Sequence, residues 1–447
     1  MAFTRLKTWT SELLTSSDLN DEFNNLITND ALLGFPRTAD AAFASFKATF
    51  DADFDTYIQS STDDELIVAI GGTLFTFKLS SGGLTVEGAS GEPVAVWQPS
   101  INVSDNLIIN GGFGVAQRGV GPFVSTSTPP NSDGEYLLDR WILLSDGNNV
   151  VSVEREILPT AVTAFGAFAV CKMTVLTGTR KFGIFQPIES FDSKKCRGGK
   201  LSLSFDARKL TGAPATQLRA GVVSWGTGTA DVITSDIVSA WNAFGTNPSI
   251  AAGTGWTFLG DAPVALTDLT DTYQRFKIEN ITVPSTACNN LGVFIWIETD
   301  IGVGDGIYIG NVQLELGEHS TPFRARRYVE ELAECQRFFE RIGGVTATTY
   351  VGSGFFTSLN ATATVIMNYT RKRDATPVAT SSAEMLVEGT GGTGTTTGGL
   401  GVAIVNERET TARINLTGIG GTAGADGSGC IANIVGAAAY IDIDAEL

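Results

Sequence analysis

The sequence is poor in the residues that most catalytic and metal sites require. It has a single histidine, His319, so this residue is the one histidine that could act as the base in a Ser-His-Asp or Cys-His site. We expect His319 to be an ordinary polar turn residue instead. No CxxC pair occurs, which argues against both a zinc site and a disulfide framework. The five cysteines are odd in number and far apart, and we expect buried, reduced thiols: Cys171, Cys196, Cys288, Cys335 and Cys430.

Positive charge and long apolar runs are also scarce. The 30 basic residues face 48 acidic ones, for a net charge of −18, which excludes a large basic footprint for nucleic acid or an anionic membrane. No run approaches the ~18 apolar residues of a membrane span, and residues 1–20 lack the apolar core of a signal peptide. We therefore expect a protein made in a cytosol and not inserted in a membrane. Two short basic runs, Arg324–Arg327 and Arg371–Arg373, are predicted to be solvated or to form ion pairs between subunits.

Glycine is abundant, at 51 residues, while charged residues make up only 17% of the chain. This balance is typical of many strands joined by tight turns rather than of helices with charged faces. The length suggests two to four domains, at roughly 150 residues each. We predict a mostly β protein with helix concentrated near the amino-terminus.

Residues 1–62 form the only long helical-looking region. Ser16 and Ser17 can cap a first helix, which the run Gly34–Pro36 ends. A second predicted helix carries aromatic residues at steps of 3, 4, 4 and 3, close to the repeat of a coiled-coil seam. Because so short a segment cannot cover these side chains, we predict that they pair with other copies of the chain; a monomeric helical hairpin is the alternative. The predicted oligomerisation residues are Leu19, Phe23, Phe43, Phe46, Phe50, Phe54 and Tyr57.

The pattern then changes from helical to strand-like. Leu66–Ile70 and Thr73–Leu79 flank Gly71-Gly72, which predicts a β-hairpin, since a two-residue turn needs positive φ. Leu84–Glu87 is predicted to add a third strand, and Gly88–Ser104 is predicted to be a linker.

The stretch Ile307–Glu340 ends one predicted domain and begins the next. Its first part alternates apolar residues like a half-buried strand, and Thr321-Pro322 stops the strand. A short amphipathic helix is predicted beyond it, ended by Gly343-Gly344. Its apolar stripe comprises Tyr328, Leu332, Cys335 and Phe339.

This stretch, with its sequence VQLELGEHSTPFRARRYVEELAECQRFFER, resembles the closing segment of the carbohydrate-binding-module-like jelly roll of bacteriophage and prophage tail fibres. Four further segments resemble that family's landmarks in the same order, although Tyr273 stands where the family usually has tryptophan. They are Asn106–Arg118 (NLIINGGFGVAQR), Asp139–Trp141 (DRW), Gly199–Arg208 (GKLSLSFDAR) and Tyr273–Pro284 (YQRFKIENITVP). The segment Thr15–Asn25 (TSSDLNDEFNN) is similar to tail-fibre amino-termini.

The resemblance implies a virion subunit, a homotrimer, that attaches to tail or head-tail proteins through its amino-terminus and binds a host surface glycan or protein without catalysis. A purely structural virion component, such as a tail or collar adaptor or a head fibre, is the alternative. The implied fold is a short helical segment, a jelly-roll β-sandwich and a C-terminal β-sandwich at the tip. The predicted parts are 1–62 (helical attachment), 63–104 (hairpin and linker), 105–326 (jelly roll), 327–344 (connecting helix) and 345–447 (tip).

Two long inserts interrupt the predicted jelly roll, Val120–Tyr136 and Trp225–Leu259. The second carries three tryptophans whose rings can stack on sugars, and we predict a glycan site there; the alternative is that they pack the insert onto the sandwich. These are Trp225, Trp241 and Trp256. Trp141 and Trp296 lie in apolar strands and are predicted to be core.

Catalysis and metal binding are not predicted, and no cofactor is expected. A glycan depolymerase needs two facing carboxylates, and two clusters offer carboxylates, but turn chemistry explains aspartate in these places. The clusters are Asp133, Glu135 and Asp139, and Glu298, Asp300 and Asp305. No ~20-residue repeat of a β-helix is present. Related jelly rolls often hold calcium, but Asn110, Asp139 and Asn311 supply one carboxylate among three, too few for a hard cation.

Residues 345–447 are predicted to form a last β domain. Tyr440–Leu447 alternates apolar and acidic residues, which predicts an edge strand with one wet face. Gly389–Gly401 consists almost entirely of glycine and threonine and is predicted to be an exposed, flexible loop.

Overall fold

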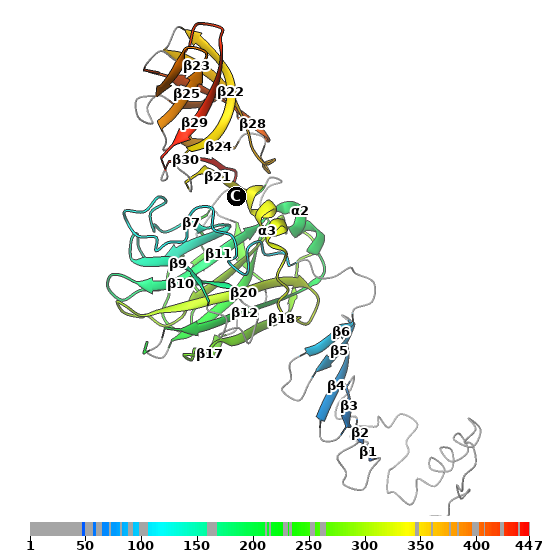
Figure 1. Ribbon diagram of the computed structural model, residues 1–447. Helices are drawn as coiled ribbons and strands as arrows, with labels where there is room; N and C mark the ends of the chain where they lie inside the picture. The colour runs from blue at the N-terminus through cyan, green and yellow to red at the C-terminus, as the bar shows by residue number, and fades with distance from the viewer. Residues whose placement is uncertain are drawn as a thin grey trace, which may run out of the picture. The chain divides into compact units, whose positions relative to one another are not determined.

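The chain divides into two compact units, Met1–Pro99 and Ser100–Leu447, and each is described by itself. The computed structural model (Figure 1) describes the backbone of six strands between residues 47 and 97, and most of the chain from 106 on. The described ranges of the second unit are 106–158, 168–210, 212–213, 216–226, 231, 235–250, 255–259, 265–344, 348–358, 361–374, 377–381, 384–395, 402–405, 407–420, 424–436 and 439–446.

The first unit contains one antiparallel sheet whose strands follow in chain order. Its strands are β1 (Lys47–Thr49), β2 (Tyr57–Gln59), β3 (Glu65–Ile70), β4 (Thr73–Ser80), β5 (Gly83–Glu87) and β6 (Pro93–Trp97). The hairpin prediction is confirmed, because Ile70 pairs with Thr73 across the two glycines. The predicted third strand is β5.

Two predictions for the first unit are wrong. Strands β1 and β2 occupy part of the stretch where a second helix was expected, and Tyr57 is a strand residue. Pairing of β2 with the strongly strand-forming β3 outweighs the helical spacing of the aromatic residues. Strand β6 lies inside the predicted linker. The other predicted oligomerisation residues, Leu19, Phe23, Phe43, Phe46, Phe50 and Phe54, lie outside the described residues.

The second unit begins with a β-sandwich of two antiparallel sheets. The five-stranded sheet has the order β18 (Gln274–Thr282), β12 (Lys200–Lys209), β20 (Gly306–Leu316), β10 (Ala169–Val175) and β9 (Val151–Ile157). The larger sheet has the order β16 (Trp256–Phe258), β13 (Gln217–Trp225), β19 (Asn290–Ile297), β11 (Phe182–Ile188), β8 (Trp141–Ser145) and β7 (Glu135–Leu138), with β17 (Ala265–Asp268) also paired to β13. Smaller elements are β14 (Val238–Ala240), β15 (Ser249–Ile250), α2 (Ser190–Ser193) and η3 (Lys194–Cys196).

The chain crosses repeatedly from one sheet to the other. It does so between β10 and β11, β11 and β12, and β12 and β13, and again around β19, which is the connectivity of a jelly roll. Side chains from both sheets fill the space between them, for example Ile184 and Val293 from one and Leu203 and Ile309 from the other. The prediction of a mostly β chain with a central β-sandwich is confirmed. Trp141 and Trp296 are each 1% exposed, and all five cysteines are free and buried, as expected.

A short helix and strand connect this sandwich to the next. The helix α3 covers Tyr328–Gln336, and strand β21 follows at once, over Phe339–Gly343. The predicted helix is therefore too long: Phe339 is a strand residue, and Tyr328 is 61% exposed. Pairing of β21 with β30 (Tyr440–Asp444) takes Phe339 out of the helix. No helix of the described residues is long and apolar enough to cross a membrane.

The second sandwich has a three-stranded sheet, β21-β30-β24, and a seven-stranded sheet, β26-β25-β29-β22-β23-β28-β27. Inward side chains of both sheets, such as Ile441 and Val365, share one core. The remaining bounds are β22 (Thr348–Ser358), β23 (Thr362–Asn368), β24 (Val378–Ser381), β25 (Glu384–Gly389), β26 (Gly392–Thr395), β27 (Val402–Val405), β28 (Thr411–Thr417) and β29 (Gly429–Val435).

Two predictions for this sandwich are corrected. Strand β30 is the central strand of its sheet, not an edge, because β21 and β24 pair with its two sides. Asp442 is ion-paired rather than solvated, because its carboxylate accepts two hydrogen bonds of 2.7 Å from Arg341. The Gly/Thr stretch is in part a hairpin of β25 and β26 that closes at Gly389 and Gly392, and residues 396–401 lie outside the described residues.

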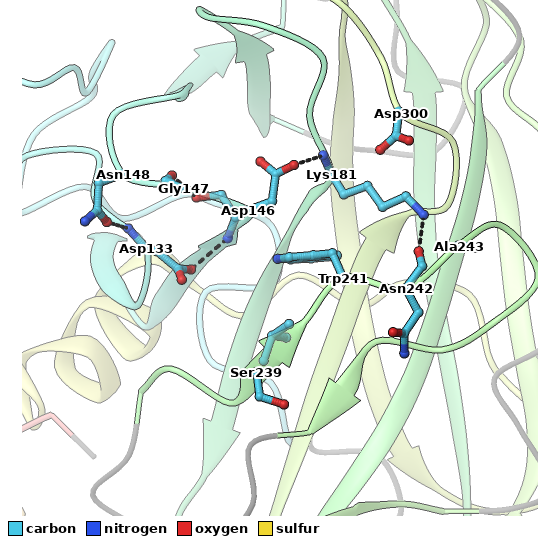
Figure 2. Close-up of a pocket in the computed structure, with 12 residues that line it drawn as sticks. Asp133, Asp146, Gly147, Asn148, Lys181, Ser239, Trp241, Asn242, Ala243 and Asp300 are labelled. Carbon is cyan, nitrogen blue, oxygen red and sulfur yellow. Dashed lines mark hydrogen bonds between the residues drawn. The ribbon is translucent and has the colours of Figure 1, made fainter.

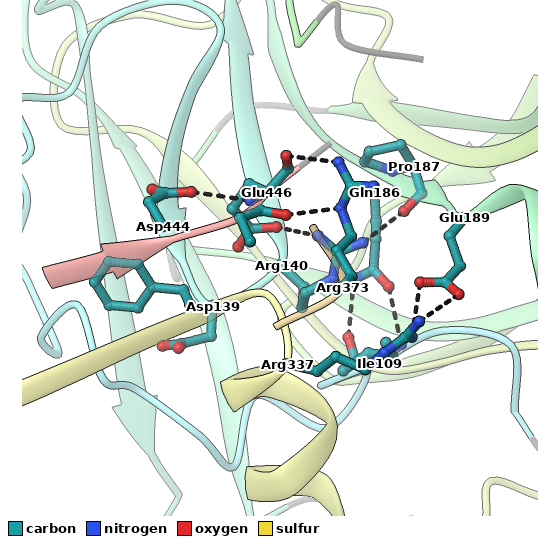
Figure 3. Close-up of polar contacts among 12 residues, drawn as sticks. Ile109, Asp139, Arg140, Gln186, Pro187, Glu189, Arg337, Arg373, Asp444 and Glu446 are labelled. Atoms are coloured by element: carbon teal, nitrogen blue, oxygen red, sulfur yellow. Dashed lines mark hydrogen bonds and ion pairs between the residues drawn. The ribbon is translucent and has the colours of Figure 1, made fainter. Parts of the chain in front are cut away.

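Ion pairs that each have at least one buried partner hold the two sandwiches of this unit together (Figure 3). Arg140, 1% exposed, donates to the Pro187 carbonyl at 2.8 Å and to the Glu446 carboxylate. Its guanidinium also lies 3.6 Å from the ring centre of Phe338. Arg337 makes a two-pronged pair with Glu189, at 2.7 and 2.9 Å. The contact is therefore rich in paired charges, an arrangement in which removing one partner is costly.

Several residues of the two basic runs make hydrogen bonds or ion pairs within the second unit. The prediction that these residues are solvated is therefore wrong. Lys372 is 2% exposed and bonds the Glu340 carboxylate at 2.8 Å, and Arg373 donates to the Ala445 carbonyl at 2.7 Å. Arg326 donates to the Asn106 carbonyl. These cations bond to acceptors on other segments of the chain. Spacing in the sequence does not reveal such partners.

Candidate functional site

A pocket of about 610 Å³ opens at one end of the larger jelly-roll sheet (Figure 2). Three strand-end turns, the segment at Asp133 before β7 and the tryptophan-bearing insert form its wall. Its lining combines the ring of Trp241 with carboxylates, an amine and amides: Asp133, Ser145, Asp146, Gly147, Asn148, Lys181, Val238, Ser239, Trp241, Asn242, Ala243 and Asp300. Such a mixture of one flat apolar surface and many hydrogen-bonding groups suits a polyhydroxylated ligand.

The turns arise where the strands run out. Strand β8 ends at Ser145, and the polar sequence Asp146–Asn149 turns the chain back towards β9, since aspartate, glycine and asparagine favour turns. Lys181 directly precedes β11, and Asp300 follows β19. Because β8, β11 and β19 are neighbours in the sheet, these residues meet at one edge.

Hydrogen bonds fix the wall. The Asp133 carboxylate accepts from the Ser145 N–H at 2.8 Å, and the Asp133 N–H donates to the Asn148 side chain at 2.9 Å. On the other side, the Lys181 ammonium donates to the Asn242 carbonyl, joining the insert to the sheet. The pocket is thus built before any ligand arrives, which lowers the ordering cost of binding.

The electrostatic character of the pocket is acidic. Burial, together with the charges of Asp236 and Asp146, raises the pKa of Asp133 to about 6, against the opposing hydrogen bond from Ser145. Burial also raises the pKa of Asp146, and the charge of Asp300 adds to that rise. A ligand that donates hydrogen bonds is therefore favoured over an anionic one.

The three predicted tryptophans have different surroundings. Trp256 is 3% exposed and meets Phe185 edge-on at 5.4 Å, within the cluster that covers the outer face of the larger sheet. Trp225 is half-buried against the same cluster. Trp241 meets Phe294 in a T-shaped contact with 6.0 Å between the ring centres, and it lines the pocket, as Figure 2 shows. Of the three, Trp241 alone belongs to the pocket, while the other two pack the insert onto the sandwich.

The members of the two predicted carboxylate clusters also lie in different surroundings, and only some of them line the pocket. Asp133 and Asp300, from different clusters, meet at the pocket. Glu298 is buried in an ion pair with Arg219 at 3.2 Å, and the Asp139 carboxylate accepts from Gln117 at 2.6 and 2.8 Å. The other two members, Glu135 and Asp305, are not among the lining residues. Sequence reasoning missed Asp146, Asn148, Lys181 and Asn242. The polar turn after β8 is a local signal for Asp146 and Asn148, but not for the other two residues.

The side chains considered for calcium hydrogen-bond to other groups of the chain. The Asn110 side chain donates to two backbone carbonyls, at 3.0 Å each, and Asn311 donates to Asp206 at 2.5 Å. Within the described ranges, no group of three His, Cys, Asp or Glu residues is arranged to hold a metal ion. His319 lies 3.2 Å from the Glu279 carboxylate, beyond the last strand of the jelly roll.

A second hollow of about 660 Å³ lies beside α3. Its exposed aromatic residues are Phe168 and Tyr328, at 64% and 61%. The Arg155 guanidinium on its wall is committed to the carbonyls of Phe113 and Gly114, at 2.8 and 2.9 Å. This hollow offers fewer hydrogen-bonding groups to a ligand than the pocket at Trp241.

Comparison with known proteins gives structural similarities only. No family model matches the chain, and no curated protein matches it. Among solved structures, a family 61 carbohydrate-binding module in complex with β-1,4-galactotriose matches with 14% identity and a TM-score of 0.26, covering 47% of this chain and 98% of the module. A xylan-binding CBM22 domain from Paenibacillus barcinonensis matches with 11% identity and 0.28, covering 49% and 100%. Tailspike protein 4 of bacteriophage CBA120 matches with 16% identity and 0.25, covering 46% of this chain and 23% of the tailspike domain. Identities and scores this low do not establish a family or a ligand.

Proposed function

We propose that this chain is a phage fibre or spike subunit that binds a host surface glycan at the Trp241 pocket, without turning it over. The observation that carries the proposal is the half-buried Trp241 ring beside carboxylates and amides that hydrogen bonds hold in place. A pyranose stacks its apolar face on such a ring while its hydroxyls donate to the carboxylates. The attachment role itself rests on the sequence resemblance to tail fibres.

The acidic lining of the pocket indicates which class of sugar it would bind. Asp133, Asp146 and Asp300 present acceptors, so neutral or amino-bearing sugars fit better than uronic or sialic acids. A single shallow pocket binds weakly, and several copies on one particle would raise the overall affinity through effective concentration.

The test is binding of the full chain to a panel of neutral, amino and acidic oligosaccharides, with Trp241→Ala and Tyr328→Ala compared. Loss of ring stacking predicts an affinity at least about tenfold lower for Trp241→Ala, while Tyr328→Ala keeps wild-type binding because it belongs to the second hollow. Circular dichroism checks that both variants fold. Loss of binding in Tyr328→Ala alone would assign the sugar to the second hollow, and no binding to any sugar would favour the structural virion role.

A further inference from the structure

The outer face of the seven-stranded sheet in the second sandwich carries large apolar side chains in water. They lie on three adjacent strands, β29, β22 and β23 (Figure 1). The exposed fractions are Tyr350 60%, Phe355 51%, Ile366 48%, Ile431 43% and Val435 39%. Isolated exposed apolar residues are ordinary, but a group of this kind on one flat face marks an interaction surface.

One row of paired residues crosses this face from strand to strand. Glu388 of β25 pairs with Ile431, Ile431 with Ser353, Ser353 with Ile366, and Ile366 with Arg413 of β28. All five side chains are exposed. Along the row, the side chains are in turn acidic, apolar, small, apolar and basic. The two ends of the row therefore carry opposite charges.

This order is complementary to itself. A two-fold axis that runs along the strands through Ser353 places Glu388 of one copy against Arg413 of the other, and Ile431 against Ile366. Ser353, the smallest member, meets its own copy at the axis, where close approach is needed. A two-fold axis along the row, at right angles to the strands, would instead place Glu388 against Glu388 and Arg413 against Arg413. The charges of the row therefore favour the axis that runs along the strands.

We propose that this face binds the same face of a second copy of the chain. The charge complementarity of Glu388 and Arg413 supports this occupant. Each copy carries a net charge of −18, so two copies repel each other overall, and a contact surface low in acid limits that repulsion. Among the described positions on β22, β23, β28 and β29, Arg413 is the one charged residue. Ile366 and Ile431 offer a sugar no hydrogen bond, so the face suits a protein surface better than a glycan.

Cysteine cross-linking tests the arrangement in the full chain, because the five native cysteines are buried and give a low background. Ser353→Cys is expected to form a cross-linked dimer under a mild oxidant. The matched control is Thr417→Cys, exposed on the same face but on β28, two strands from the axis, which is expected not to cross-link. Equal cross-linking in both variants, or none in Ser353→Cys, would overturn the proposal.

Charge exchange tests the register. In the Ser353→Cys background, Glu388→Arg is expected to slow cross-linking by about tenfold at low salt, because it opposes Arg413 with a like charge. Adding Arg413→Glu restores the pair and the rate. A rate that stays low in the exchanged double variant refutes the Glu388–Arg413 contact. No glycan takes part in either measurement, so the outcome does not depend on the sugar pocket.

Discussion

At the scale of single residues, burial decides what each side chain can do, and the sequence carries little information on burial inside inserts. Three tryptophans in one insert look equivalent in the sequence, yet Trp256 is 3% exposed and Trp241 lines the pocket. The difference arises because β16, which contains Trp256, pairs with β13 and draws that ring onto the sheet. In contrast, Trp141 and Trp296 were predictable as core because the residues next to them in the strand are apolar.

The raised pKa of Asp133 predicts a pH dependence of stability. A carboxyl whose folded pKa is about 6, against 3.8 for the free group, is protonated more readily in the folded state. Stability from this group is therefore present below about pH 4 and declines as the pH rises to about 6. Because the carboxyl is partly exposed, solvent screening reduces the effect to about 1 kcal/mol.

The measurement is urea denaturation of the wild type and Asp133→Asn at pH values from 4 to 7. The amide keeps an acceptor for the Ser145 N–H but does not titrate, so the wild type should lose stability relative to the variant as the pH rises. Parallel curves for the two proteins would show that Asp133 titrates near its ordinary value.

At the scale of elements, strands with strict alternation and glycine turns were predictable, whereas the partner of each strand was not. The hairpin at Gly71-Gly72 follows from local turn chemistry. The helix after Arg327 was predicted too long, and β30 was taken for an edge, because both depend on the pairing of β21 with β30 across about a hundred residues. Long-range pairing of this kind leaves no local signal.

Close approach of neighbouring strands gives a test of β20, the strand between β12 and β10. A Cβ added at Gly306 would lie 1.9 Å from the Met173 carbonyl oxygen, so Gly306→Ala must shift the β10–β20 pairing. We expect a loss of about 1–3 kcal/mol in unfolding free energy, as in other overpacked sites. Gly114→Ala is the control, since an added Cβ there meets none of the described atoms within 4 Å. Equal stabilities of the two variants would contradict the close contact.

At the scale of the second unit, the two sandwiches share one charged contact that the sequence did not reveal. Arg118 and Arg140 come from the family-like landmarks of the jelly roll, while Glu446 comes from the far end of the chain. The resemblance predicted the jelly roll but gave no partners for these arginines. Burial of Arg140 without Glu446 would leave a charge uncompensated in the interior, which makes the pair a coupling between the sandwiches.

Removing the carboxylate should uncouple them. Glu446→Gln leaves Arg140 without its counter-charge, and we expect a loss of about 3–5 kcal/mol. In calorimetry the wild-type sandwiches should unfold in one transition, and the variant should show an earlier, separate one for the second sandwich. Arg371→Gln is the matched control, because Arg371 is 75% exposed in its pair with Glu409 and such surface pairs contribute about 0–1 kcal/mol. If Glu446→Gln kept a single transition at the wild-type temperature, the buried pair would not couple the sandwiches, and the remaining contacts, such as the Arg337–Glu189 ion pair, would have to do so instead.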